Sequence, residues 1–180
     1  MGYVLPQSFF TKAQLKTIQT AAMSSIIAKC GYNRKTKTEV IYGPTILAGA
    51  GFVVLATIQG TGQIMLFLKL WRTGCQTSRL LRVALAWAQL SAGTSQPILT
   101  DTTTDLPHLK VRWLHSLRDF LQEIDAEIEI DHDQVPQIQR QFDEHIMDKV
   151  LTENAFTNKE INRINNCRLY LQAATIADIC

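Results

Sequence analysis

Cysteine is scarce and dispersed in this sequence. The chain has four cysteines in 180 residues, and no two of them form a Cys-x-x-Cys pair. Zinc ribbons and disulfide frameworks need cysteines at short, paired spacings, so neither is expected. None has a helix-start position or a basic flank strong enough to predict a thiol of low pKa. We therefore predict reduced thiols inside a cell at Cys30, Cys75, Cys167 and Cys180.

Long apolar runs are also missing. The run Ile64–Trp71, apolar except at Lys69, is far shorter than the roughly 20 residues that a membrane-spanning helix needs. The N-terminus lacks the basic patch and apolar core of a signal peptide. With 46% hydrophobic residues the chain can nevertheless bury a sizeable core. We expect a folded, soluble, intracellular protein with no membrane partner.

The short motifs of common catalytic and nucleotide-binding sites are absent. No serine lies in a Gly-x-Ser-x-Gly elbow. The glycines at 49 and 51 lack the Gly-x-Gly-x-x-Gly spacing and the Gly-Lys-Ser/Thr ending of phosphate-binding loops. A catalytic triad whose members meet only in the folded protein stays open. We predict no cofactor and a purely structural loop, with tight turns or close backbone approach, at Gly43, Pro44, Gly49 and Gly51.

Acidic residues are rare in the first two thirds of the chain. Met1–Glu123 contains 13 Lys or Arg and 5 Asp or Glu, whereas Ile124–Cys180 contains 5 and 11. This asymmetry predicts a basic helical domain over residues 1–125 and an acidic helical appendage, packed on it, over residues 126–180. It favours contact with a polyanion through the basic part only.

Helical periodicity dominates what remains and predicts a mainly α, irregular domain of about six to seven helices. Thr157 and Glu160 form a capping box at the start of the last long helix. Thr175–Asp178 repeats that cap pattern, which predicts that the appendage is truncated at its end. The expected helices cover approximately residues 8 or 11 to 29, 57–72, 77–91, 107–124, 136–151 (broken near Asp143) and 157–173.

Two short segments have strand-like patterns. Thr38–Tyr42 is rich in β-branched and aromatic residues and precedes the turn Gly43-Pro44. Residues 126–130 alternate Glu with Ile, which is typical of a half-buried strand. One or two short β-strands are therefore expected within the helical fold.

The basic residues of the front half form small groups. These cations either make up a solvated face or contact nucleic-acid phosphates, because Lys and Arg supply the salt-dependent part of such binding. The candidate phosphate contacts are Lys12 and Lys16 on the first helix, Arg34, Lys35 and Lys37 in the loop after it, and Arg79 and Arg82 on the helix over 77–91.

The three tryptophans lie at core spacing on predicted helices. Trp71, Trp87 and Trp113 could stack on bases, but we favour burial in the core. On the helix over 77–91 the predicted core face contains Leu80, Ala84, Trp87, Ala88 and Ser91.

A cluster of potential metal ligands occupies the acidic part. His145 and Asp148 are three residues apart and would share a helix face, so a hard-metal or phosphohydrolase site is conceivable. No other helix offers a matching pair of ligands, and we favour a solvated acidic surface with no metal. The cluster consists of Asp131, His132, Asp133, Asp143, Glu144, His145 and Asp148.

A series of short motifs resembles a known family. These are Leu5-Pro6-x-Ser8, Lys29-Cys30-Gly31-Tyr32-Asn33-Arg34, Tyr42-Gly43-Pro44, Gly49-Ala50-Gly51-Phe52 and Leu70-Trp71-Arg72, followed by Trp87-Ala88-Gln89-Leu90, Ile146-Met147-Asp148 and Asn166–Gln172. Their order resembles the region downstream of the polymerase palm in reverse transcriptases of non-LTR retrotransposons. The resemblance extends over nearly the whole chain, although the family's first loop glycine is Ala48 here.

The resemblance implies a supporting role without catalysis. No two aspartates are adjacent anywhere in the chain, so the metal-holding Asp-Asp motif of the palm is missing. The resemblance implies a thumb- or connector-like part that packs on an upstream polymerase core and touches RNA or an RNA–DNA duplex. The alternative expectation is a helical protein-interaction module with no nucleic-acid role.

Overall fold

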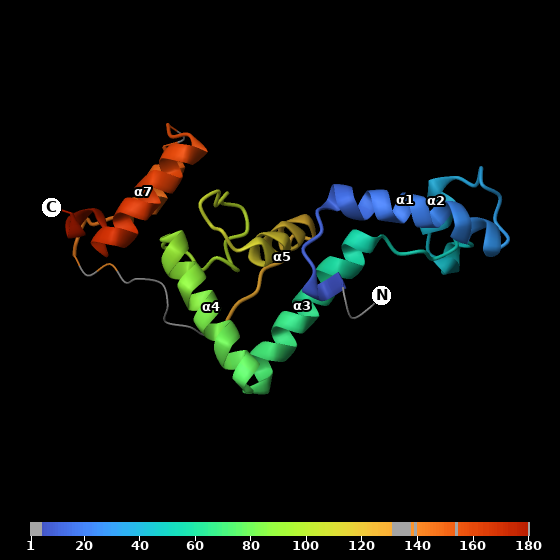
Figure 1. Ribbon diagram of the computed structural model, residues 1–180, viewed down its shortest axis with the longest axis horizontal. Coiled ribbons are helices and arrows are strands. Elements are labelled where there is room, and N and C mark those ends of the chain that lie inside the picture. The colour runs from blue at the N-terminus through green and yellow to red at the C-terminus, as the bar shows by residue number, and fades with distance from the viewer. Residues whose placement is uncertain (1–4, 131–137, 139, 154, 180) are drawn as a thin grey trace. The chain divides into compact units, whose positions relative to one another are not determined.

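The computed structural model describes residues 5–130, 138, 140–153 and 155–179 (Figure 1). Seven α-helices and no β-strand occur within these ranges, so the predicted mainly α fold is confirmed. The chain forms two compact units, Met1–Phe67 and Leu68–Cys180. The helices are α1 (Lys12–Lys29), α2 (Thr38–Tyr42), α3 (Leu55–Thr73), α4 (Gln76–Ala92), α5 (Arg112–Glu123), α6 (Ile146–Thr152) and α7 (Asn158–Leu171).

Helix α1 begins and ends at local signals. Thr11 caps it by a capping box with Gln14, in which each side chain accepts a hydrogen bond from the other residue's backbone amide. At the other end Gly31 adopts a φ of +81°. That left-handed conformation lets the Tyr32 amide donate to the Ile27 carbonyl at 3.0 Å, which terminates the helix.

Buried glutamines hold the first unit together. Gln19 of α1 is 9% exposed; its side chain donates to the Tyr42 hydroxyl and accepts from the Leu55 amide at 2.9 Å. On α3, Gln59 donates to the Phe10 carbonyl at 3.1 Å and Gln63 to the Ser8 carbonyl at 3.0 Å. Amides buried this deeply stabilise a fold only when they are hydrogen-bonded. These bonds therefore fix α3 against α1 and the segment before it.

The glycine loop between α2 and α3 folds back on itself. The Gly51 amide donates to the Gly43 carbonyl at 2.9 Å, and the Ala50 amide donates to the Val40 carbonyl at 2.8 Å. A Cβ added to Gly49 would lie 2.2 Å from the Gly43 carbonyl oxygen. Two backbone segments are in direct contact here, as the glycines had suggested.

The second unit has its core between α4, α5 and the connection that joins them. Gln89 of α4 organises this connection: its side chain donates to the Gln96 carbonyl at 3.0 Å and accepts from the Ile98 amide at 2.9 Å. His108 donates from Nε2 to the Ala92 carbonyl at 3.0 Å, and burial lowers its pKa. The apolar core includes Ile98, Leu99, Leu106, Leu109, Leu114, Leu117 and Leu121.

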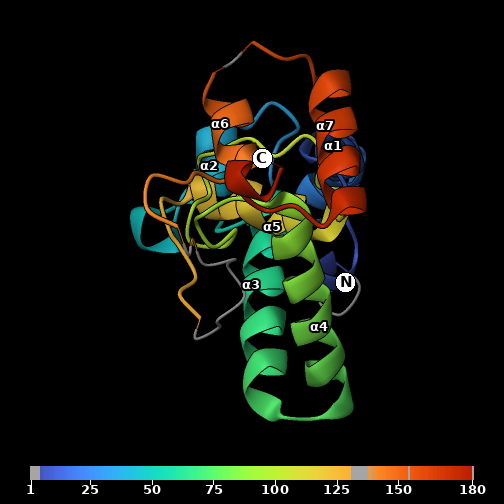
Figure 2. The same ribbon diagram turned by 90° about the vertical axis from the view of Figure 1, so that its left-hand side faces the viewer.

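Helix α7 is attached to the C-terminal end of α4 by a buried arginine. Arg168 is 3% exposed and donates through Nη2 to the Leu90 carbonyl at 2.7 Å and the Ser91 carbonyl at 2.8 Å. Its Nε donates to Asn165 at 2.9 Å. Helices α6 and α7 lie side by side (Figure 2). The predicted capping box at Thr157 and Glu160 is confirmed as the start of α7.

Both expected strands are wrong. Thr38–Tyr42 is the short helix α2, whose Val40 and Ile41 amides donate to the Lys37 carbonyl. Residues 126–130 have no regular secondary structure, with Ile128 buried and its neighbours Glu127 and Glu129 exposed, as the alternation indicates. The Ile128 amide donates to the Leu99 carbonyl at 3.0 Å, but a strand needs a longer paired neighbour than this.

Two expected helices are shorter than predicted. Residues 106–109 form a turn in the core, closed by the Leu109 amide and the Leu106 carbonyl at 3.0 Å, so α5 begins only at Arg112. Before α6, Phe142 adopts a φ of +67°, which is incompatible with a helix and agrees with the predicted break near Asp143. The expected start at Pro136 lies outside the described residues.

The units do not coincide with the charge-based domains. The chain divides at Phe67, inside α3, and not at residue 125. Residues beyond 125 are bonded to the elements before them: Asp148 accepts from the Ser95 amide at 3.0 Å, and Arg168 binds the end of α4. The acidic residues and α4 therefore belong to one unit.

Candidate nucleic-acid interface

The first basic group lies at the start of α1. Lys12 and Lys16 are both exposed, and between them Leu15 is buried, 2% exposed. The first turn of α1 has no acidic residue, so no negatively charged side chain of that turn offsets the partial positive charge of this helix end. This end of the helix is therefore positive in both its side chains and its backbone.

The second basic group lies in the loop after α1. Arg34, Lys35 and Lys37 are exposed. Asn33 shapes the loop, because its side chain accepts from the Lys35 amide at 3.0 Å and its carbonyl accepts from the Thr36 amide at 2.9 Å. The three cations are thus presented by a defined turn.

The structure does not gather these five cations into one cluster. Lys16 and Lys29 are separated along α1 by thirteen helical steps, or about 20 Å at 1.5 Å per residue. The loop with Arg34, Lys35 and Lys37 follows Lys29 and lies at the α2 end of α1 (Figure 1). The two basic groups therefore mark opposite ends of one exposed helix.

Arg79 and Arg82 lie on α4 in the second unit and differ in their contacts. Arg82 donates to the Trp71 carbonyl at 2.8 Å, and its guanidinium lies 4.0 Å from the centroid of the Trp71 ring. This cation–π contact fixes the corner between α3 and α4. Arg79 is exposed.

The glycine loop has little capacity to hold a phosphate. A phosphate cradle needs backbone amides that point outward without partners. Here the Gly49 amide donates to the Pro44 carbonyl, and the Ala50, Gly51 and Phe52 amides donate to other backbone carbonyls. The loop uses its amides to close itself.

Two members of the acidic cluster, Asp143 and Asp148, accept hydrogen bonds from the backbone. Asp143 accepts from the Ala177 amide at 3.1 Å, and hydrogen bonds, first from the Thr175 hydroxyl, lower its pKa. Asp148 accepts from the Ser95 amide with both oxygens. His145 is 3% exposed, and its Nδ1 has no partner. Asp131, His132 and Asp133 lie outside the described residues.

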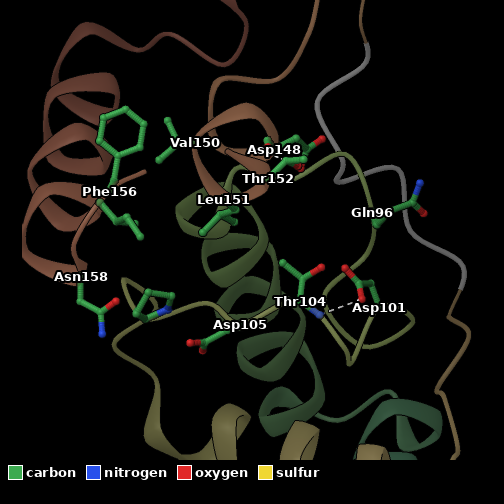
Figure 3. Close-up of a pocket in the computed structure, with 12 residues that line it drawn as sticks. Gln96, Asp101, Thr104, Asp105, Asp148, Val150, Leu151, Thr152, Phe156 and Asn158 are labelled. Carbon is green, nitrogen blue, oxygen red and sulfur yellow. Dashed lines mark hydrogen bonds between the residues drawn. The ribbon is translucent and has the colours of Figure 1, made fainter. Parts of the chain in front are cut away.

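A hollow of about 460 Å³ in the second unit contains further carboxylates (Figure 3). Asp101 and Asp105 come from the connection before α5, and Asp148 comes from α6. Burial raises the pKa of Asp101, but hydrogen bonds from Thr104 and Thr103 outweigh this and lower it overall. Within the ranges that the structure describes, no three His, Cys, Asp or Glu side chains are placed to hold a metal ion.

The expected burial is wrong for Trp87 and for most of one α4 face, and it holds only in part for Trp71 and Trp113. Trp87 is 60% exposed, and Trp71 and Trp113 are half-buried. Of the face predicted for the core of α4, Leu80 is 64% exposed and only Ala88 is fully buried. Helix α4 turns its opposite side inward because Gln89 must reach the connection that follows it.

Cys75 is a residue whose reactivity the sequence analysis missed. It is the N-cap of α4 and is exposed, with the backbone amides of Ser78 and Thr77 lowering the pKa of its thiol. The sequence signal was the predicted start of a helix at 77, because thiols at helix N-termini ionise more readily. Cys30, Cys75 and Cys167 are free thiols.

Cys75 should be the most readily alkylated of the three described cysteines. At pH 7 its lowered pKa leaves a larger thiolate fraction than an ordinary thiol has, and the thiolate is the reactive form. Timed iodoacetamide labelling with peptide mass spectrometry should show Cys75 modified before Cys30 and Cys167. Equal rates at all three sites across pH 6–9 would contradict this assignment.

No family model, curated protein or solved structure matches this chain. Among the helices in the described ranges, none combines the length and apolar character required to cross a bilayer.

Proposed function

We propose that this chain is the non-catalytic, C-terminal part of a retroelement reverse transcriptase-like protein and that its first unit contacts the nucleic-acid backbone. The observation that carries the proposal is the charge of that unit. Residues 1–67 contain six Lys or Arg and one acidic residue, Glu39, and all six cations are exposed. A surface of this kind attracts phosphates, whatever the base sequence.

The spacing of the two basic groups supports a contact along one strand. About 20 Å separates the ends of the α1 segment between them, which equals roughly six nucleotide steps at 3.4 Å per step. Lys12 and Lys16 would hold one backbone segment, and Arg34, Lys35 and Lys37 another. The upstream polymerase core would supply the catalytic aspartates that this chain lacks.

The glycine loop supports the family resemblance. Ala48 adopts a φ of +61°, in the left-handed region where glycine is favoured. The family that the sequence resembles has glycine at this position, and Ala48 has a backbone conformation that suits glycine. Gly49 and Gly51 remain at the two positions where backbone contact and a φ of +67° require them.

Binding to a labelled RNA–DNA duplex should be tight at low salt and fall steeply as salt rises. If the five cations contact phosphates, the affinity should drop roughly 500-fold between 50 and 200 mM salt, because each contact contributes a slope of about −0.9. The variant Lys16→Ala/Lys35→Ala/Lys37→Ala should reduce this drop to roughly tenfold. Fluorescence anisotropy across the salt series measures both slopes.

A charge-matched control is available in the second unit. Lys110, Lys149 and Lys159 are exposed, and replacing all three with alanine removes the same charge. This control should leave the salt slope unchanged. Equal slopes for the two triple variants would refute a contact through the first unit.

The alternative is a helical protein-interaction module with no nucleic-acid role. It is favoured by the exposed apolar side chains on α4, including Trp87. An absence of duplex binding at 50 mM salt would leave this alternative in place of the proposal.

A further inference from the structure

Helix α4 is apolar on two opposite sides. One side faces the core of the second unit through Leu85, Ala88 and Ala92. The other side carries four large apolar residues with exposed fractions of 64%, 67%, 60% and 42%. We call these the α4 stripe: Leu80, Val83, Trp87 and Leu90.

The α4 stripe has the spacing of a helix-pairing seam. Its members follow one another at three, four and three residues, so they lie on one face along three turns of the helix. A contiguous exposed row of large apolar side chains lowers the solubility of a protein. Such a row is more often an interaction site than a surface that stays in contact with water. Another helix can cover such a row along its full length.

The composition of the α4 stripe favours a protein partner over single-stranded RNA. Bases bind through stacking on aromatic rings. Only Trp87 offers such a ring, and its neighbours Leu80, Val83 and Leu90 are aliphatic. Aliphatic side chains around a central tryptophan form the usual composition of a protein-binding hot spot.

Charge around the α4 stripe indicates which kind of helix fits. Residues 68–92 contain Lys69, Arg72, Arg79 and Arg82 and no acidic residue. Arg79 is exposed immediately beside Leu80. We propose that the α4 stripe binds an amphipathic α-helix of another polypeptide whose apolar seam is flanked by Asp or Glu. This site is independent of the nucleic-acid contact proposed for the first unit.

A second copy of the chain is a poorer occupant. Pairing α4 with α4 would bury two apolar rows but would leave Arg79 of each copy without an acidic partner on the facing helix, because α4 has no Asp or Glu. Charged groups beside an interface select partners through complementary charge. An acidic helix satisfies both the apolar row and these cations.

The test uses two labelled probe peptides of about three heptads, each with Leu at the a and d positions. One carries Glu and the other Lys at the e and g positions, and these like charges keep each peptide from pairing with itself. Fluorescence anisotropy with the full chain should show saturable binding of the acidic peptide. The basic peptide should bind roughly tenfold more weakly, since several charge pairs become repulsive.

Substitutions locate the binding on the α4 stripe. Trp87→Ala should weaken acidic-peptide binding roughly thirtyfold, as expected for a central tryptophan. Phe142→Ala, at an aromatic residue that is 94% exposed outside α4, should leave it unchanged. Arg79→Glu should reduce the preference for the acidic peptide. Circular dichroism and thermal unfolding should show that each variant remains folded, since all three positions are exposed.

Several outcomes would overturn the proposal. It fails if the acidic peptide does not bind, or if Trp87→Ala and Phe142→Ala affect binding equally. It also fails if Trp87→Ala abolishes only the binding of a single-stranded RNA oligonucleotide. Sedimentation that shows self-association lost in Trp87→Ala would identify a second copy of the chain as the occupant.

Discussion

Gly49→Ala is expected to disrupt the first unit. The new Cβ would lie 2.2 Å from the carbonyl oxygen and 2.3 Å from the carbonyl carbon of Gly43. Both atoms belong to the backbone, so no side-chain rotation can relieve the overlap. The two segments must separate, and the hydrogen bond from the Gly51 amide to the Gly43 carbonyl would be lost with them. We expect a destabilisation of about 3 kcal/mol or more.

Hydrogen exchange measures this effect within the first unit. The Ala50, Gly51 and Phe52 amides are bonded to Val40, Gly43 and Ile41, and they should lose protection in Gly49→Ala. Peptides from α5 and α7 should keep their protection from hydrogen exchange, because these helices belong to the second unit.

Gly31→Ala is the matched control for Gly49→Ala. Gly31 also lies in the first unit, and a Cβ added there meets nothing within 4 Å. Its φ of +81° makes alanine strained by about 1–2 kcal/mol, with no steric overlap. If Gly31→Ala proved as damaging as Gly49→Ala, the close backbone contact would not be what requires glycine in the loop.

Arg168→Met should destabilise the second unit by about 3 kcal/mol or more. Methionine retains much of the apolar volume of arginine but removes the bonds to Leu90, Ser91 and Asn165. Hydrogen bonds to a charged group contribute about 1.5–3 kcal/mol each, and carbonyls left buried without partners add a further cost. The positive charge also stabilises the C-terminal end of α4, where the helix carbonyls lack partners of their own.

Urea unfolding followed by tryptophan fluorescence measures this loss directly. All three tryptophans lie in the second unit, at positions 71, 87 and 113. Arg163→Met is the control in the same helix: Arg163 is exposed, and its replacement should change stability by no more than about 0.5 kcal/mol. Similar losses in the two variants would show that the bonds to α4 contribute little.

Local signals were sufficient to predict several elements. Thr157 and Glu160 act on the turn beside them, so the start of α7 follows from a short stretch of sequence, as does the end of α1 near Gly31. The sequence left the start of α1 open between Ser8 and Thr11, and the structure has Thr11 as the cap. The close backbone contact at Gly43 and Gly49 was also predictable, because glycine is required where no side chain fits.

Partners distant in sequence decided the features that were predicted wrongly. Residues 126–130 alternate like a strand, but their contact with a distant segment is the bond from the Ile128 amide to the Leu99 carbonyl, where a strand would need a longer paired partner. Residues 106–109 have a helical pattern but are held as a turn in the core, where His108 bonds to Ala92. Periodicity describes one segment at a time and cannot specify what lies opposite it.

The features of the candidate site also separate into those that the sequence determined and those that the tertiary structure decided. The sequence by itself determined the mainly helical fold, the basic character of the first unit and the identity of its cations, because composition and local propensity carry that information. The sequence also placed these cations in two groups, on the first helix and in the loop after it, whereas only the tertiary structure decided that α4 presents Trp87 to solvent. A helix with apolar residues on two sides can bury either side. In α4 the contacts of Gln89 and Arg168 select the side that faces the core.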